Sequence, residues 1–150
     1  MRVVVQRVLE ASVDVDGKTV SSIGPGMLVL AAFRNGDDEA ELAWMAKKCL
    51  ELRIFEDDRD KMNRSIVDAD GELLVVSQFT LYGDCRRGRR PDFMASAPAE
   101  EAQRLYRRFL DILGGYYPKV SEGVFGAKMK VRLANDGPVT LIIDRGADRA

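Results

Sequence analysis

Only two stretches of this 150-residue chain carry the spacing of an amphipathic helix, and this limits its possible folds more than any other feature. The first covers residues 38–52 and opens with Asp38 and Glu41, which stand at the spacing of a capping box. Its apolar residues recur at three- and four-residue intervals, as the buried stripe of a helix does: Leu42, Met45, Cys49 and Leu52.

The second helical stretch begins at Ser96 and Pro98, because proline is favoured in a first helical turn. The pair Gly114-Gly115 is expected to end it. Its buried stripe is expected to consist of Ala102, Leu105, Tyr106, Phe109 and Leu113.

Short apolar runs typical of strands fill the rest of the chain. The first run turns back in a hairpin about Asp16-Gly17, and residues 26–33 read as a strand buried on both faces. Further strands are expected at 53–57, 72–83, 126–134 and 139–144. This order predicts one α+β domain over residues 1–150, with a curved, mostly antiparallel or mixed, barrel-like sheet covered by two helices. Since no glycine-rich phosphate loop follows a strand, a doubly wound nucleotide fold is not expected.

Composition indicates a cytoplasmic protein. Apolar residues make up 46% and charged residues 31% of the chain, as in globular proteins. No apolar run approaches the roughly 20 residues that span a bilayer, so no membrane partner is expected. The start of the chain is charged too soon for a secretory signal. The net charge of -1 gives no overall attraction to nucleic acid, so RNA binding would need a local patch and no DNA partner is expected.

The chain contains no histidine, and this narrows its possible chemistry. Ser-His and Cys-His catalytic pairs are excluded, and so are the usual zinc sites that contain histidine. Neither cysteine is expected to be a catalytic thiol, because Cys49 lies on the apolar stripe of a helix and Cys85 has no histidine to pair with. No metal or cofactor is expected. Proton transfer must come from other side chains, backbone groups, water or the substrate.

The stretch "SQFTLYG" at 77–83 places polar side chains at the end of a buried strand. If the strand continued, Ser77 and Phe79 would point to one side and Gln78 and Thr80 to the other. An amide beside a hydroxyl can polarise a carbonyl or hold a small polar ligand. The alternative is a polar strand end bonded to its neighbours.

The stretch "CRRGRRPDF" concentrates four arginines in one predicted loop at 83–97: Arg86, Arg87, Arg89 and Arg90. Guanidinium groups match phosphate oxygens, so the loop could clamp phosphates of a nucleic acid. The alternative is an ordinary solvated loop.

The stretch "RLANDGPVTLIID" at 132–144 reads as two strands separated by a break. Gly137 and Pro138 stand in this break, where proline removes a backbone donor just as a strand begins. On the first strand, alternation places Arg7 on the same apolar face as Val3 and Val5. An arginine there either reaches solvent or binds the carbonyls of a turn, and we consider the Gly-Pro turn as its partner.

Together, "SQFTLYG" and "NDGPVT" resemble the two signature motifs of the D-aminoacyl-tRNA deacylases. The likeness extends through "MRVVVQRVLEASV", "RRGRRPDF" and "FGAKM" and covers essentially the whole chain in order. The resemblance implies a homodimer that hydrolyses the ester of D-aminoacyl-tRNA at its aminoacylated 3′ end. It leaves open which tRNAs are preferred and whether glycyl-tRNA mischarged on alanine tRNA is cleaved.

The resemblance also implies roles for particular residues. Ser77, Gln78, Phe79 and Thr80 would form the floor around the scissile carbonyl. Gly137 and Pro138, joined by a cis peptide, would reach into the partner's pocket and reject L-amino acids. We add two residues to this expected filter, Arg7 as the brace of the turn and Asn135 from the same motif. Catalysis would use the 2′-hydroxyl of the tRNA rather than a side-chain base, which agrees with the missing histidine.

Two other functions stay open at this point. The chain could be a non-catalytic RNA-binding protein that uses its arginine loop. It could also be a hydrolase with Thr80 or Ser77 as a covalent nucleophile, although for Thr80 we expect a positioning role.

Overall fold

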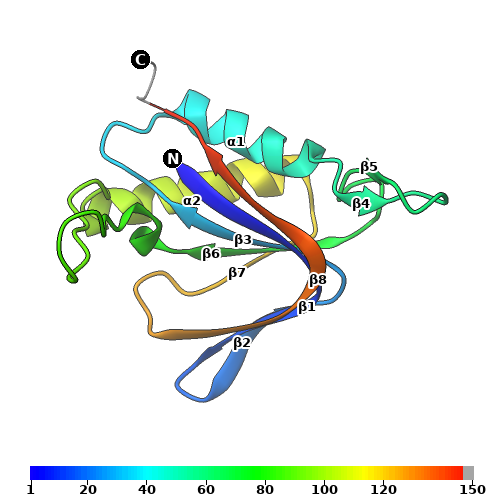
Figure 1. Ribbon diagram of the computed structural model, residues 1–150, viewed down its shortest axis with the longest axis horizontal. Coiled ribbons are helices and arrows are strands. Elements are labelled where there is room, and N and C mark those ends of the chain that lie inside the picture. The colour runs from blue at the N-terminus through cyan, green and yellow to red at the C-terminus, as the bar shows by residue number, and fades with distance from the viewer. Residues whose placement is uncertain (147–150) are drawn as a thin grey trace.

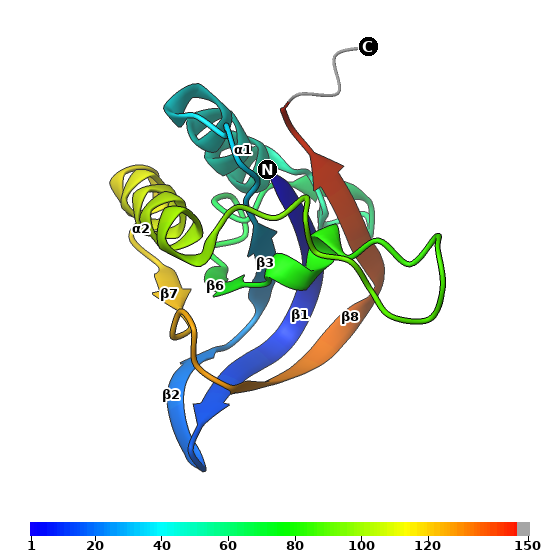
Figure 2. The ribbon, with the colours of Figure 1, turned by 90° about the vertical axis from the view of Figure 1, so that its left-hand side faces the viewer.

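The protein is described here by a computed structural model that covers residues 1–146 (Figure 1). Two helices, α1 (Glu39–Glu51) and α2 (Ala99–Tyr116), lie side by side over one face of a six-stranded mixed sheet. The sheet curls strongly, so that β2 and the start of β8 turn away from the helices (Figure 2). This confirms the predicted α+β, barrel-like fold. The sheet's strands are β1 (Arg2–Val15), β2 (Lys18–Ile23), β3 (Gly26–Ala32), β6 (Glu72–Ser77), β7 (Val120–Glu122) and β8 (Met129–Asp144).

The long strand β1 organises the sheet. Its first half lies between β3 and the end of β8, and its second half lies between β2 and the start of β8. The predicted hairpin joins β1 to β2, with Asp16 and Gly17 at φ of 50° and 77°, as a tight hairpin turn requires. β3, β6 and β7 run parallel to one another, whereas the other pairs are antiparallel.

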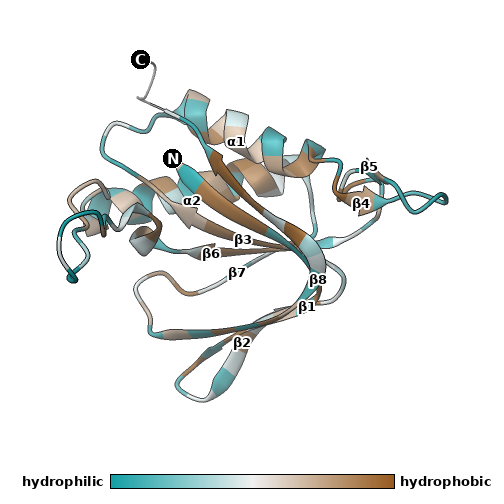
Figure 3. Cartoon of the chain, viewed as in Figure 1, coloured by the Kyte–Doolittle hydropathy of each residue, from teal (hydrophilic) through white to brown (hydrophobic). Residues whose placement is uncertain are grey.

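Apolar residues pack on both faces of the sheet, and its central strands are largely hydrophobic along their length (Figure 3). On β3, Met27 packs toward the helices, whereas Leu28 packs into the second core inside the curl. The prediction that residues 26–33 form a strand buried on both faces is therefore confirmed. The second core matters for function, because its edge continues into the cavity described below.

The helices agree with the predictions at their starts and differ at one end. Asp38 caps α1 and forms both bonds of the capping box with Glu41. α2 was expected to stop at Gly114-Gly115 but runs to Tyr116, so that prediction is wrong. Buried Leu113 and the hydrogen bond from the Tyr117 hydroxyl to the Gly71 carbonyl, 2.6 Å, hold the helix end against the sheet. This packing outweighs the low helix propensity of glycine.

The predicted strand at 72–83 is also too long. β6 ends at Ser77, and Phe79–Tyr82 form one turn of 3-10 helix, η1. The neighbouring strand β3 ends at Ala32, so the chain beyond Ser77 has no strand to pair with and turns inward. The expectation that Phe79 and Thr80 alternate along a strand is therefore wrong.

The last two predicted strands are one strand, β8, which passes through the expected break. β7 was not expected, and it adds a short parallel strand beside β6. The predicted strand at 53–57 is reduced to β4 (Phe55–Glu56), which pairs with β5 (Met62–Arg64) in a separate two-stranded sheet.

Candidate active site

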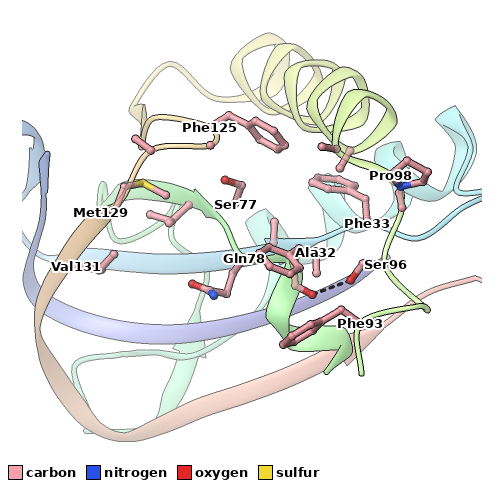
Figure 4. A pocket seen from close by; sticks show the side chains of 18 residues that line it. Ala32, Phe33, Ser77, Gln78, Phe93, Ser96, Pro98, Phe125, Met129 and Val131 are labelled. Carbon is pink, nitrogen blue, oxygen red and sulfur yellow. Dashed lines mark hydrogen bonds between the residues drawn. The ribbon is translucent and has the colours of Figure 1, made fainter. Parts of the chain in front are cut away.

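A cavity of about 650 Å³ opens where β3 and β6 end, beside the start of α2 and the start of β8 (Figure 4). Its wall is mostly apolar and includes Phe33, Phe125, Met129 and Val131. Three polar side chains also line it: Ser77, Gln78 and Ser96. An apolar cleft with a few polar groups is the usual form of a small-ligand site.

Gln78 is held at the cavity wall by its backbone and its side chain. Its N–H donates to the Ala31 carbonyl at 2.7 Å, which continues the pairing of β6 with β3 for one residue. Its amide nitrogen donates to the Thr80 hydroxyl. The amide is therefore held in place at the cavity.

The residues of "SQFT" do not all reach the cavity. Ser77, Gln78 and Phe79 line it, whereas exposed Thr80 does not and contacts it only through the amide of Gln78. In the described part of the chain, no carboxylate or amine accepts a hydrogen bond from the Thr80 hydroxyl. The arrangement suits a positioning role better than a nucleophile, which needs an adjacent base.

Ser96 connects the two sides of the cavity mouth, a role that no sequence pattern predicted. Its hydroxyl donates to the Phe79 carbonyl at 2.9 Å (Figure 4), so η1 is tied to the loop that leads into α2. Phe125 was also missed, although the "FGAKM" stretch that contains it was noticed.

The "NDGP" stretch forms a large bulge in β8. Gln6 pairs with Thr140 and Val8 with Asn135, so four residues of β8, 136–139, stand opposite the single residue Arg7. Gly137 and Pro138 are exposed at the bulge, and their peptide bond is cis. This is a bulge within one strand rather than a turn between two.

Arg7 and Asn135 fasten the bulge to β1. The Arg7 guanidinium is only 4% exposed, donates to the Asp136 carbonyl at 3.3 Å and forms an ion pair with the Asp136 carboxylate at 2.9 Å. Asn135 donates to the carbonyls of Arg7 and Val139, each at 3.1 Å. The expected contact between Arg7 and the carbonyls beside Gly-Pro is present, and the alternative that Arg7 reaches solvent is wrong.

The same guanidinium also links the bulge to the chain after α1. Its Nη1 donates to the Ile54 carbonyl at 2.6 Å, and its Nη2 lies 3.7 Å from the Glu56 carboxylate. A buried arginine with this many acceptors is fixed in position, so the bulge rests on a rigid support.

The bulge and the cavity are separate within one chain. Among the described residues, those lining the cavity include Ser77, Gln78 and Phe79 but neither Gly137 nor Pro138.

The arginine loop projects beyond η1, and a backbone bridge between Asp84 and Asp92 closes it at 2.8 and 3.0 Å. All four arginines are exposed, but they are not equivalent. Arg86 forms a forked ion pair with Asp84, and its guanidinium and backbone hydrogen bonds lower the pKa of that carboxyl to about 2. Within residues 1–146, Arg87, Arg89 and Arg90 form no ion pair.

The cysteines lie outside the cavity wall. Burial raises the pKa of the Cys49 thiol to about 12, so this residue is an inert part of the core, as expected. Cys85 is exposed in the arginine loop.

Comparison with known proteins places this geometry in context. A family model described as D-Tyr-tRNA(Tyr) deacylase matches residues 4–144. A protein of Clostridium botulinum (strain Eklund 17B / Type B) named D-aminoacyl-tRNA deacylase is 56% identical over 144 residues, 96% of this chain and 97% of that protein. A protein of the same name from Chlorobaculum parvum is 57% identical over 147 residues, with 96% and 97% covered.

Two solved structures share the fold. One, titled "c-Myc DNA Unwinding Element Binding Protein", is 43% identical with a TM-score of 0.93, and the match covers 98% of this chain and 100% of that one. The other is titled as a probable eukaryotic D-amino acid tRNA deacylase. It is 23% identical with a TM-score of 0.79 over 96% and 98% of the two chains, so it supports the fold alone.

In residues 1–146, neither helix is long and apolar enough to cross a membrane.

Proposed function

Because the chain belongs to the D-Tyr-tRNA(Tyr) deacylase family, we propose that it hydrolyses the ester bond of D-aminoacyl-tRNA and releases a free D-amino acid and tRNA. One observation carries the proposal beyond family membership. The two motifs of the family likeness form part of a mostly apolar cavity wall, including two of its three polar side chains, and an exposed, rigidly supported bulge, as a two-part site would need.

The reaction needs little from side chains. An aminoacyl ester is an activated bond, so holding it beside water and stabilising the developing oxyanion supply much of the rate. Water adds to the carbonyl carbon, the bond to the terminal ribose oxygen breaks, and that oxygen takes a proton. In our proposal the amide of Gln78 orients the aminoacyl group, and the 2′-hydroxyl of the terminal ribose assists the proton transfer.

Selection for the D-configuration is assigned to Gly137 and Pro138 of a second copy. These residues are exposed and outside their own cavity, and Arg7 and Asn135 hold them in place. A fixed backbone wall excludes by steric clash the enantiomer whose side chain points at the wall, without recognising that side chain. Such a wall cannot reject glycine, so glycyl-tRNA is also expected to be cleaved.

The homodimer is part of the same proposal. β8 pairs only with β1 among the described strands, and its outer part exposes Leu141 and Ile142, the latter at 69%. Apolar side chains beside an unpaired strand edge are typical of a subunit contact. The cytoplasmic location and the absence of a DNA partner remain predictions.

The decisive experiment compares single-turnover cleavage of D-, L- and glycyl esters of one tRNA. Cleavage of the D- and glycyl esters with rejection of the L-ester supports the proposal. Binding of tRNA without cleavage of any ester would instead identify a non-catalytic RNA-binding protein.

Replacing Thr80 by alanine should leave substantial activity, at least about a tenth of the wild-type single-turnover rate, because one supporting hydrogen bond is lost. Thr80→Ser serves as the control that keeps the hydroxyl. A covalent acyl adduct on Thr80, detected by mass spectrometry after a quench, would show that this residue is a nucleophile and contradict the positioning role.

Replacing Arg7 by alanine should loosen the support of the bulge while the protein stays folded. We expect the ratio of D- to L-ester cleavage to fall about five- to thirtyfold, the effect of 1–2 kcal/mol of lost positioning. Arg53→Ala is the matched control, since Arg53 also donates to a backbone carbonyl, that of Asn63 at 2.9 Å, but away from the bulge. An unchanged D/L ratio in Arg7→Ala would remove Arg7 from the filter.

A further inference from the structure

Two aromatic rings stand exposed at the mouth of the cavity. Phe79 is 55% exposed and Phe93 is 37% exposed, and their ring centroids lie 5.2 Å apart in an edge-to-face arrangement. Met94, the next residue, is 89% exposed. Exposed apolar groups gathered at one place mark a binding surface more often than isolated ones do.

Phe93 is fixed by its surroundings. The residue before it, Asp92, is bridged to Asp84 through backbone hydrogen bonds. The carbonyl of Phe93 accepts a hydrogen bond from the Ser96 N–H at 3.0 Å. Its ring also packs against Gly83, where an added Cβ would lie only 3.0 Å from the ring. A ring held in place while exposed gives a preorganised contact, because little side-chain freedom is lost when a ligand covers it.

The adjacent arginines indicate what covers the ring. Arg87, Arg89 and Arg90 form no ion pair within the described chain, whereas Arg86 is held by Asp84. Cations in the same loop as an exposed aromatic ring match the combination that binds single-stranded nucleic acid, with phosphates on the cations and a base stacked on the ring.

We propose that Phe93 is a stacking platform for a nucleobase of the single-stranded 3′ end, upstream of the terminal aminoacylated adenosine. Arg87, Arg89 and Arg90 hold the neighbouring phosphates, and Arg86 braces the loop through Asp84. This assignment rests on the proposed function, because it takes the 3′ end of tRNA as the occupant of the cavity.

The test compares two substrates that differ only upstream of the reacting group: D-aminoacyl-tRNA and D-aminoacyl-adenosine. In Phe93→Leu, kcat/KM for the tRNA should fall about ten- to hundredfold more than kcat/KM for the adenosine ester, since one stacked base is lost. Phe93→Trp should restore cleavage of the tRNA. Equal losses on both substrates, or full activity of the leucine variant, would overturn the proposal.

The arginines provide a matched comparison within one loop. Arg87→Gln and Arg89→Gln should each lower the slope of log affinity for uncharged tRNA against log salt by roughly 0.7, the value for one phosphate contact on a single strand. Arg86→Gln should change this slope least. An equal change for Arg86 would contradict the division of roles.

Two further outcomes separate this inference from its premises. If the wild-type protein cleaves neither substrate, the proposed function fails, but the affinity of the Phe93 variants for uncharged tRNA still tests the platform. If Phe93→Leu sediments as a monomer while the wild type is a dimer, the surface is a subunit contact and the nucleobase assignment is wrong.

Discussion

A one-to-one mixture of Gln78→Ala with a Pro138 variant that has itself lost D-ester cleavage should recover about a quarter of the wild-type activity. The reason is the separation of the cavity from Gly137 and Pro138 within one chain. If each site takes its cavity from one chain and its filter from the other, a mixed dimer contains one site with two intact halves and one with two damaged halves.

The expected fraction follows from random pairing. About half of the dimers are mixed, and half of the sites in each mixed dimer are intact. The measurement is single-turnover cleavage of a D-ester after the subunits have been mixed and exchanged, with each variant alone as the control. Failure to recover activity, despite subunit exchange shown by mass spectrometry, would contradict the shared site. It would mean that each site takes both motifs from one chain, or that one of the motifs is not part of the site.

Pro138→Ala alone should remain folded and lose selectivity, either by slower cleavage of the D-ester or by weaker rejection of the L-ester. The physical reason is that Pro138 is exposed and contributes little to the core, whereas the filter depends on a fixed wall. A modest change in stability with unchanged selectivity would mean that the bulge only completes the strand.

Gln78→Ala is expected to reduce the single-turnover rate about ten- to a thousandfold, the range seen when one donor to a developing oxyanion is removed. Gln78 lines the cavity, and its backbone remains anchored to Ala31 in the variant, so the fold should be kept. Gln103→Ala, at an exposed position of α2, is the matched control. A wild-type rate for Gln78→Ala would remove this residue from the active site.

The sequence predicted those parts of the fold that depend on local patterns. The capping box of α1 is a contact between residues three apart, and the hairpin at Asp16-Gly17 needs only two residues with positive φ. Both were predicted correctly, because the residues that determine each structure are neighbours in the chain.

The errors arose where distant contacts decide the structure. β6 ends at Ser77 because its neighbour β3 ends, and α2 continues past Gly114 because Leu113 and Tyr117 pack on the sheet. In the candidate site, Ser77, Gln78 and Phe79 line the cavity and the expected Arg7 contact is present, whereas Thr80 lies outside the cavity wall. Ser96 and Phe125 reach the cavity only through the tertiary fold.

The bulge of β8 also bears on how this protein can vary. Pairing with β1 is regular from Met129 to Ala134, shifts once more at Asn135 and resumes at Thr140, so the four residues 136–139 lie outside the ladder of the sheet. Of these four residues, Asp136 is bound by Arg7 and Val139 is buried in the core, whereas Gly137 and Pro138 are exposed. Substitutions at the two exposed positions can therefore change the surface that the bulge presents without shifting the strand on either side.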